Sequence, residues 1–252
     1  MEHEFRGYAL VLHDGADPRT GGVAIAGFTT AGMVGVIAAS HIIKSLKLQQ
    51  LGTVLNSEFP AVALIHDQVP KHPVRVYQGD KIGVFTSEIR FKDKQDIMFA
   101  STVLEWFTKG GFENLIIIDG IVSPDKQLTH GELYGVGSSS LARQRLKHAG
   151  IAPIRQGIVA GITGFLLGEG DRLGIDVTAL LAEASPMYPD ARAAALAIEA
   201  VSELTGIEIP LTELLENARE IENSVKEVFE KSVTMLPGPE DDDDSFADPS
   251  FG

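Results

Sequence analysis

Cysteine is absent from this chain of 252 residues, and long apolar runs are absent as well. Without cysteine, structural disulfides, thiolate metal ligands and thiol nucleophiles are excluded. No uninterrupted apolar run reaches the roughly 18 residues that a membrane-spanning helix needs. An apolar leader preceded by lysine or arginine is also missing. These absences predict a soluble cytoplasmic protein.

Basic residues are scarce: 21 lysines and arginines stand against 35 acidic residues, which gives a formal net charge of −14. Residues 236–252 contain six acids and no base, so residues 1–235 carry 29 acids against 21 bases. An acidic chain is repelled by nucleic acid and by anionic membranes, and we expect neither as a partner. Residues 236–252 are too polar to pack and are predicted to form a disordered acidic tail.

The central stretch of the sequence is a strand, a glycine turn and an apolar helix, over residues 23–48. A β-rich apolar run over 23–28 gives way to an alanine-rich segment without charge before Lys44. The glycines of this corner are Gly27, Gly32 and Gly35. A helix with so little polar surface must be covered on most sides, so this corner is predicted to lie in the middle of the fold.

The spacing of these glycines differs from that of known nucleotide-binding loops. Gly27, Gly32 and Gly35 do not form G-x-G-x-x-G, and no Lys-Ser or Lys-Thr follows them. No acidic residue stands about 20 residues further on to hold a ribose. We therefore interpret the three glycines as a structural turn that allows close packing of the helix on the sheet.

Strands alternate with helices through residue 159 and helices follow from about residue 187, which predicts one α/β domain over 1–235. Gly79-Asp80 is typical of a hairpin turn, so part of the sheet is expected to be antiparallel. Residues 115–118 are predicted to be a buried strand closed by Asp119-Gly120. The other expected elements are a strand at 154–159, a helix capped by Asp190 and a helix over 212–231.

The sequence offers few residues that could carry chemistry. The seven histidines are scattered, and His66 and His72 are too irregularly spaced for helical metal ligands. His13 with Asp14 and Asp17 could be proposed as a metal cluster, but loops of this composition are usually solvated turns, so no metal or cofactor is expected.

The nucleophile motif G-x-S-x-G is absent. Asp119 is most simply a turn acid before glycine, and Glu88 with Arg90 is as compatible with a surface pair as with a site. The residues therefore point to no particular reaction.

Several stretches, taken in order, resemble the proteasome assembly chaperone family, in the form of an archaeal-type member. The apolar helix with its glycines, the turn NSEFP and the buried strand ending in glycine are similar to that family's segments. So are a glycine-rich stretch, an acidic residue followed by Pro-Asp and an Ala-Ala helix start, and a closing helix. In this sequence they read AGFTTAGMVGVIAASHII, NSEFP, LIIIDGIV, GIVAGITGFLLGEGDRLGID, LLAEASPMYPDARAAALAIEAV and LTELLENAREIE.

The resemblance implies a three-layer α/β/α sandwich with a mixed, phosphorylase-like sheet and a helical C-terminal part. It also implies a non-catalytic, homo-oligomeric chaperone that binds α-type proteasome subunits or precursors, with a paralogous chaperone as a possible second partner. Some family members dock through a C-terminal hydrophobic-Tyr-any tripeptide. Here the chain ends in Ser250, Phe251 and Gly252, which suggests Phe251 and Gly252 as partner-binding residues.

The alternative is a nucleoside- or phosphate-binding enzyme of phosphorylase-like fold. It would use the Gly27–Gly35 turn for phosphate and Glu58 or Asp119 as the acid. An anionic substrate requires basic residues, and the only ones between residues 23 and 55 are His41, Lys44 and Lys47, late in or beyond the helix. This shortage favours the chaperone.

Overall fold

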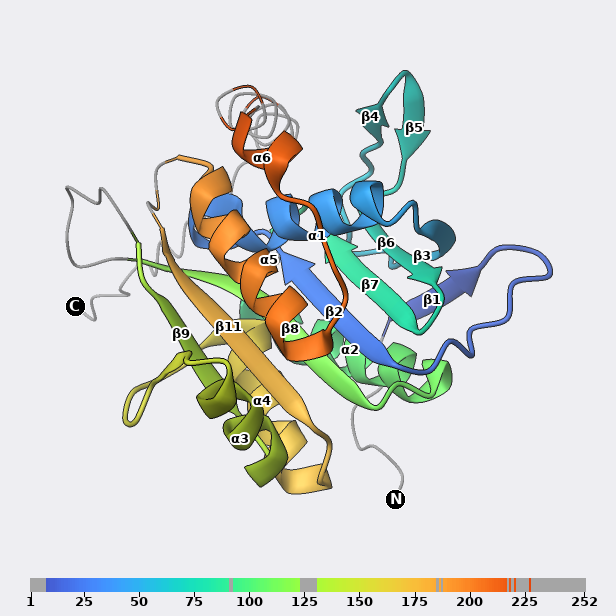
Figure 1. Ribbon diagram of the computed structural model, residues 1–252. Coiled ribbons are helices and arrows are strands. Elements are labelled where there is room, and N and C mark those ends of the chain that lie inside the picture. The colour runs from blue at the N-terminus through green and yellow to red at the C-terminus, as the bar shows by residue number, and fades with distance from the viewer. Residues whose placement is uncertain are drawn as a thin grey trace, which may run out of the picture.

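The computed structural model describes residues 8–90, 93–122, 131–184, 186, 188–216, 218, 220 and 227 (Figure 1). The expected acidic tail over 236–252 lies outside these residues. The strands are β1 (Ala9–Leu12), β2 (Val23–Phe28), β3 (Gln49–Leu55), β4 (Leu64–His66), β5 (Val69–Lys71), β6 (Val74–Gly79), β7 (Ile82–Ser87), β8 (Asn114–Val122), β9 (Leu133–Gly137), β10 (Ala152–Pro153) and β11 (Val177–Ala184). The helices are η1 (Ala31–Met33), α1 (Val34–Ser45), η2 (Asp93–Gln95), α2 (Asp96–Gly110), α3 (Ser140–His148), α4 (Gly161–Leu173), α5 (Ala191–Thr205) and α6 (Thr212–Glu216).

Nine strands form one mixed sheet in the order β1-β3-β6-β7-β2-β8-β11-β9-β10. The four central strands β7, β2, β8 and β11 are parallel, and β1, β3 and β6 extend the sheet antiparallel from β7. On the other side, β9 is antiparallel to β11 and parallel to β10. The hairpin expected around Gly79-Asp80 is the β6–β7 connection, so the mixed sheet predicted from the sequence is confirmed.

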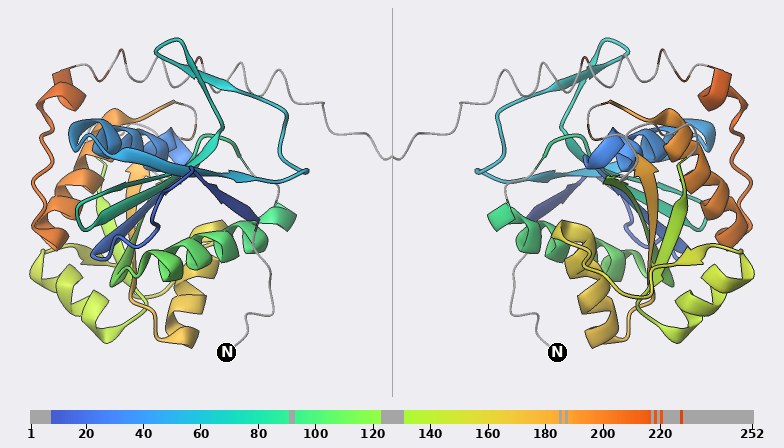
Figure 2. Two further views of the ribbon diagram at one scale, coloured as in Figure 1. Left: turned by 90° about the vertical axis from the view of Figure 1, so that its right-hand side faces the viewer. Right: turned by 90° about the vertical axis from the view of Figure 1, so that its left-hand side faces the viewer.

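Helices cover both faces of the sheet, as Figure 2 shows with the sheet seen edge-on. Helices α1, α5 and α6 pack on one face, where they share a core cluster with the apolar side chains of Ile25, Ile116 and Leu180. Helices α2 and α4 pack on the other face. The three-layer α/β/α arrangement expected from the sequence is therefore confirmed.

The face below α2 is filled by aromatic rings. Phe28, Phe85 and Phe99 meet one another edge to face, with ring centroids 5.4 to 6.3 Å apart. Trp106 lies against Phe85 at 5.5 Å. Such rings bury large apolar areas and prefer this geometry, so this layer contributes strongly to stability.

Several local expectations are confirmed and two are wrong. β2 spans the predicted residues 23–28, and Asp190 caps α5 by accepting a hydrogen bond from Ala193 N at 2.9 Å. The predicted strand at 154–159 is wrong, because β10 comprises only residues 152–153 and a loop follows. Asp119-Gly120 does not close β8, which continues to Val122. Most of the helix expected beyond residue 216 lies outside the described residues.

Strands β4 and β5 form a separate two-stranded ribbon that projects from the body between β3 and β6 (Figure 1). A two-stranded ribbon is only marginally stable by itself. It therefore needs an attachment to the sheet.

We predict that Gly27→Ala lowers the free energy of unfolding by about 2–3 kcal/mol, because a Cβ at Gly27 would lie 2.1 Å from the backbone oxygen of Gly35. Gly168→Ala is the matched control, since a Cβ there meets nothing within 4 Å and Gly168 lies on the exposed side of α4. That change should be neutral or stabilise by up to about 1 kcal/mol. Urea unfolding followed by circular dichroism measures both, and equal stabilities of the two variants would contradict the prediction.

Candidate functional site at the carboxyl ends of the central strands

The glycine corner brings helix α1 into direct contact with the backbone of two central strands. A Cβ at Gly27 in β2 would collide with Gly35 O, and a Cβ at Gly35 in α1 would lie 2.5 Å from Ile118 O in β8. Gly120 is equally close, since its Cβ would lie 1.9 Å from Ala31 O. These short distances leave no space for a side chain, and they support the interpretation of Gly27 and Gly35 as packing positions.

Gly32 has a different role, because its backbone is left-handed with φ +61°. Its oxygen accepts a hydrogen bond from Asp190 N at 2.8 Å, which attaches the start of α5 to the turn. A Cβ at Gly32 would lie 2.5 Å from the Cβ of Ala184 at the end of β11. The turn is therefore packed between β11 and α5, and its glycines face protein atoms where the alternative function requires a phosphate.

A cavity of about 830 Å³ lies beside this corner, at the carboxyl ends of β2 and β8. In open α/β sheets, this edge is where ligands bind. Its lining residues are Thr30, Asp96, Asp119, Gly120, Ile121, Ile154, Gly157, Ile158, Val159, Ala160, Gly161 and Leu181. Volumes of about 300 to 1,000 Å³ are typical of small-molecule sites.

Asp119 is the buried acid of this cavity, with 9% of its surface exposed. Its Oδ2 accepts a hydrogen bond from Thr163 Oγ1 at 2.5 Å, in the first turn of α4. Its Oδ1 is buried and has no hydrogen-bond partner in the part of the chain that the structure describes. Burial raises the pKa of the Asp119 carboxyl above its ordinary value, although hydrogen bonds from Thr163, Thr30 and the backbone of Gly120 act in the opposite direction.

The lining of the cavity does not fit acid–base catalysis on a phosphate. Within the described residues, its polar side chains are Thr30, Asp96 and Asp119, and no lysine, arginine or histidine lines it. An anionic substrate would therefore find two carboxyl groups and no cationic side chain among the described lining residues. The same described residues contain no group of three or more His, Cys, Asp or Glu that could hold a metal ion.

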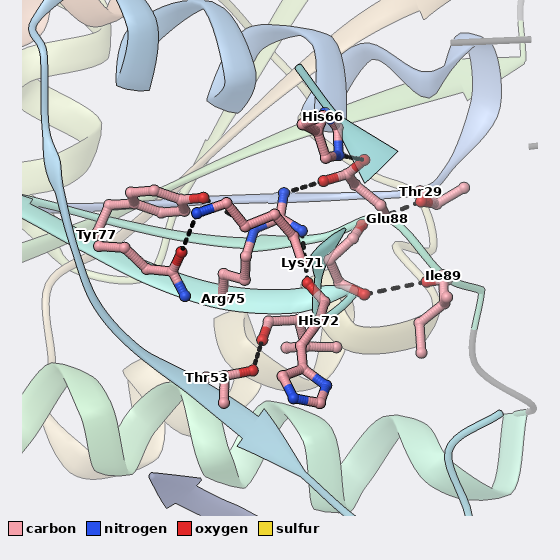
Figure 3. A network of polar contacts seen from close by, with 12 residues as sticks. Thr29, Thr53, His66, Lys71, His72, Arg75, Tyr77, Glu88 and Ile89 are labelled. Atoms are coloured by element: carbon pink, nitrogen blue, oxygen red, sulfur yellow. Dashed lines mark hydrogen bonds and ion pairs between the residues drawn. The ribbon is translucent and has the colours of Figure 1, made fainter. Parts of the chain in front are cut away.

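A second polar cluster is buried where β6 and β7 meet the β4–β5 ribbon (Figure 3). Arg75 in β6 and Glu88, directly after β7, form an ion pair between side chains that are 5% and 7% exposed. Arg75 Nε also donates to the hydroxyl of Tyr77 at 2.9 Å. His66, on the ribbon, places Nε2 at 3.1 Å from Glu88 Oε2. Glu88 therefore attaches the ribbon to the sheet.

The charge of Glu88 is stabilised by these partners. Burial by itself would raise the pKa of Glu88, but the hydrogen bond from His66 and the positive charge of Arg75 lower it below its ordinary value. The sequence is compatible with a surface pair of Glu88 and Arg90, whereas the structure buries Glu88 and pairs it with Arg75, 13 positions earlier in an alternating strand. The available signal was the position of Arg75 as the second residue of β6, which the antiparallel register places opposite Thr86, near the end of β7 and close to Glu88.

The other candidates from the sequence are not brought together. Glu58 is exposed in a turn and accepts a hydrogen bond from Gln95 Nε2 at 3.1 Å, and it does not line the cavity. Phe251 and Gly252 lie outside the described residues. No helix in the described part of the chain combines the length and apolar character needed to cross a membrane.

We predict that Glu88→Gln lowers the free energy of unfolding at neutral pH by about 3 kcal/mol, because Arg75 then stays buried without a carboxylate. The folded pKa of Glu88 is depressed, so its contribution is complete above its ordinary value near 4.5 and is lost as the pH falls through the folded pKa. The difference between wild type and Glu88→Gln should therefore shrink in acid. Denaturant unfolding at several pH values measures it.

Glu105→Gln is the control for this prediction, because Glu105 pairs with Lys109 on the exposed surface of α2. Its stability should stay close to that of the wild type at every pH. A Glu88→Gln variant as stable as Glu105→Gln would contradict a stabilising role for the buried pair.

Comparison with known proteins identifies relatives over most of the chain. The structure of Pyrococcus furiosus PbaA, described as an archaeal homolog of proteasome-assembly chaperone, is 27% identical with a TM-score of 0.78, covering 89% of this chain and 99% of that one. P. furiosus PbaB, described as an archaeal proteasome activator, has a TM-score of 0.71 over the same shares at 22% identity, which shows the shared fold. An uncharacterised protein of Methanocaldococcus jannaschii is 25% identical over 214 residues, 85% of this chain and 88% of that one.

The resemblance to proteasome assembly chaperones predicted from the sequence segments is confirmed by these findings. The model of the PAC2 family matches residues 24–229, from the second residue of β2 to beyond α6. Because this match covers well over half of the sequence, the chain belongs to the PAC2 family.

Proposed function

We propose that the protein is a non-catalytic chaperone that binds α-type proteasome subunits or assembly intermediates and assists assembly of the 20S proteasome. The observation that carries this proposal is the likeness to PbaA at 27% identity over 89% of the chain, together with membership of the PAC2 family. The protein would act in the cytoplasm as a homo-oligomer, alone or with a paralogous chaperone.

The lining of the Asp119 cavity supports this function over the phosphorylase-like alternative. A phosphate or nucleoside substrate would need cations at the glycine turn, and the described lining residues supply none. The turn itself is filled by backbone contacts around Gly27 and Gly35. A chaperone needs exposed apolar surface for its client, and no nucleophile or general base is required.

The β4–β5 ribbon is the part of the surface that best suits contact with a client. Ile65 and Val69, one on each strand, are 61% and 47% exposed. Figure 1 shows the ribbon projecting beyond the helices, and the buried Glu88 contacts it through His66, at the turn end of β4. Ile65 pairs with Pro70 and Val69 with His66, so the two side chains lie on opposite faces of the ribbon. We propose that the ribbon inserts into a groove of an α-type subunit, which buries both side chains when the complex forms.

We expect the tagged protein, mixed with separately produced α and β subunits, to elute with α subunits on size exclusion with light scattering. The complex should disappear when mature proteasomes form, because a chaperone leaves the finished product. A protein that elutes alone and leaves the assembly rate unchanged would contradict the proposal.

Deletion of residues 251–252 tests the role of the tail. An unchanged affinity for α subunits would contradict docking through Phe251 and Gly252.

The double variant Ile65→Ser, Val69→Ser should bind α subunits about tenfold more weakly. Losing roughly 50 Å² of apolar contact costs about 1.4 kcal/mol, which is a factor of ten in affinity. Leu141→Ser is the matched control, since Leu141 on α3 is 54% exposed and lies away from the ribbon. Titration by fluorescence anisotropy measures the three proteins. Equal loss in the control would show that the ribbon is not the contact surface.

A further inference from the structure

We propose that a basic groove at the β9–β10 edge of the sheet binds the acidic C-terminal segment of the same chain, residues 240–246. This inference does not depend on the proposed binding of proteasome subunits, and it does not involve Phe251 or Gly252. It rests on a concentration of positive charge in an acidic protein, on cations that have no acidic partner and on the composition of the segment that would meet them.

Positive charge is concentrated in one part of the sequence. Residues 133–168 contain four arginines and lysines and no aspartate or glutamate, in a chain that has 35 acids in 252 residues. An even distribution of those acids would place five of them in this range. The range includes β9, α3 and β10, and β10 is the last strand of the sheet (Figure 1). This edge is therefore a basic surface on an acidic molecule.

A groove of about 630 Å³ lies between α3, β9 and β10. Arg143 and Lys147 on α3 and Arg155 after β10 line it with exposed side chains, and no acidic residue lines it in the described part of the chain. Arg145 on α3 is paired with Asp176 at 2.9 Å, whereas none of the three lining cations forms an ion pair within the described residues. The groove therefore presents three positive charges that a ligand can reach.

The dipole of α3 accounts for only one of these cations. Lys147 lies in the last turn of α3, where a positive side chain interacts favourably with the helix end. Arg143 lies near the start of α3, where the dipole disfavours a cation, and its Nη1 donates to Gly137 O and Ser138 O at 3.0 Å. Arg155 belongs to no helix. A ligand with several negative charges would stabilise all three.

The C-terminal segment has the matching composition. Residues 240–244 are five consecutive acids, Phe246 follows them, and residues 236–252 contain no base. The groove is lined with aliphatic side chains beside its cations, from Leu146, Ile151 and Pro153. The carboxylates would pair with the cations while the ring of Phe246 covers the aliphatic part. A small anion such as phosphate would leave that part exposed to water.

The covalent connection favours the segment of the same molecule over that of a second copy. Asp241 is 25 positions beyond Glu216, the end of α6, and such a length reaches up to about 80 Å at full extension. A domain of this size has a diameter of about 45 Å, so the groove is within reach. A tethered segment acts at an effective concentration on the order of 1 mM, far above that of a dissolved second copy.

The first test couples lysines to carboxylates in the full-length protein with a carbodiimide, which joins an amine and a carboxyl group in contact, and identifies the joined peptides by mass spectrometry. We expect Lys147 to be joined to residues 240–244 at least about five times more often than Lys81. Lys81 is the control because it is exposed on the β6–β7 hairpin and does not line the groove. Salt at about 1 M should abolish the difference, since the Debye length falls to about 3 Å. Equal yields at low salt would overturn the proposal.

Two further samples identify the occupant. In an equal mixture of unlabelled and ¹⁵N-labelled protein, we expect joined peptides of a single isotope, whereas mixed pairs in random proportion would assign the segment to a second copy and overturn the contact within one molecule. With inorganic phosphate at about 1 mM and constant ionic strength, the joined product should persist. Its loss would assign the groove to a small anion and overturn the proposal.

The second test measures affinity with a fluorescent peptide of residues 236–252, followed by anisotropy. Full-length protein in which residues 240–244 are changed to the neutral amides should bind the peptide at least about tenfold more tightly than the wild type, because the wild-type groove is already occupied by its own segment. Equal affinities of the two proteins would overturn the proposal.

Lys147→Gln with Arg155→Gln, in the same neutral-tail protein, should weaken peptide binding about three- to tenfold, the effect of losing two exposed ion pairs. Lys81→Gln with Lys94→Gln is the matched control, because it removes the same charge from exposed positions that do not line the groove. Its affinity should stay close to that of the neutral-tail protein. Equal losses in the two double variants would show a general charge effect and overturn the assignment of the groove.

Discussion

Helix α1 lies directly on the backbone of β2 and β8, and the rest of the fold depends on this approach. It is possible only because Gly27, Gly35 and Gly120 have no side chain where the three backbones meet. The close contact buries an almost uncharged helix against the centre of the sheet. It also determines where the turn before α1 lies, and Gly32 in that turn holds the start of α5 through the hydrogen bond from Asp190.

Two buried acids near the carboxyl edge of the sheet behave in opposite ways, and the reason is the presence or absence of a cation. Arg75 and His66 stand beside Glu88, and the pKa of Glu88 is lowered in spite of its burial. Asp119 has neutral hydrogen-bond donors, among them the hydroxyl of Thr163, and burial raises its pKa in spite of them. Glu88 is thus a completed structural pair, while Asp119 retains an unsatisfied acceptor.

The layers of the fold could be predicted from the sequence because they depend on local patterns. The apolar run at 23–28, the hairpin at Gly79-Asp80 and the cap at Asp190 each act within a few residues. The strand predicted at 154–159 was wrong because its apolar residues line a cavity and a loop surface, which a short apolar run does not distinguish from a strand. A pattern of apolar residues indicates which positions are buried, and residues in a cavity wall are partly buried although they belong to no sheet.

The candidate site was predicted less well because its residues meet through long-range contacts. Asp119 was interpreted as a turn acid, since Asp-Gly is typical of turns, yet β8 continues past it and its neighbour Leu181 lies opposite in β11. Thr163 is 44 positions away from Asp119. The Arg75–Glu88 pair was missed for a related reason: Arg75 lies in an alternating strand, and only the antiparallel register of β6 and β7 brings it to Glu88.

The contact between Glu88 and the ribbon is joined to the Asp119 cavity by two adjacent residues after β2. Thr29 Oγ1 donates to Ser87 O at 3.0 Å, next to Glu88, and Thr30 Oγ1 accepts from Gly120 N at 3.2 Å, next to Asp119. Because β7, β2 and β8 are parallel neighbours, their carboxyl ends share one edge, and the Thr29-Thr30 segment spans it. A shift of this segment would alter both hydrogen bonds together. The proposed client surface and the Asp119 cavity are thus attached to the same short segment, which the close packing of α1 holds in place.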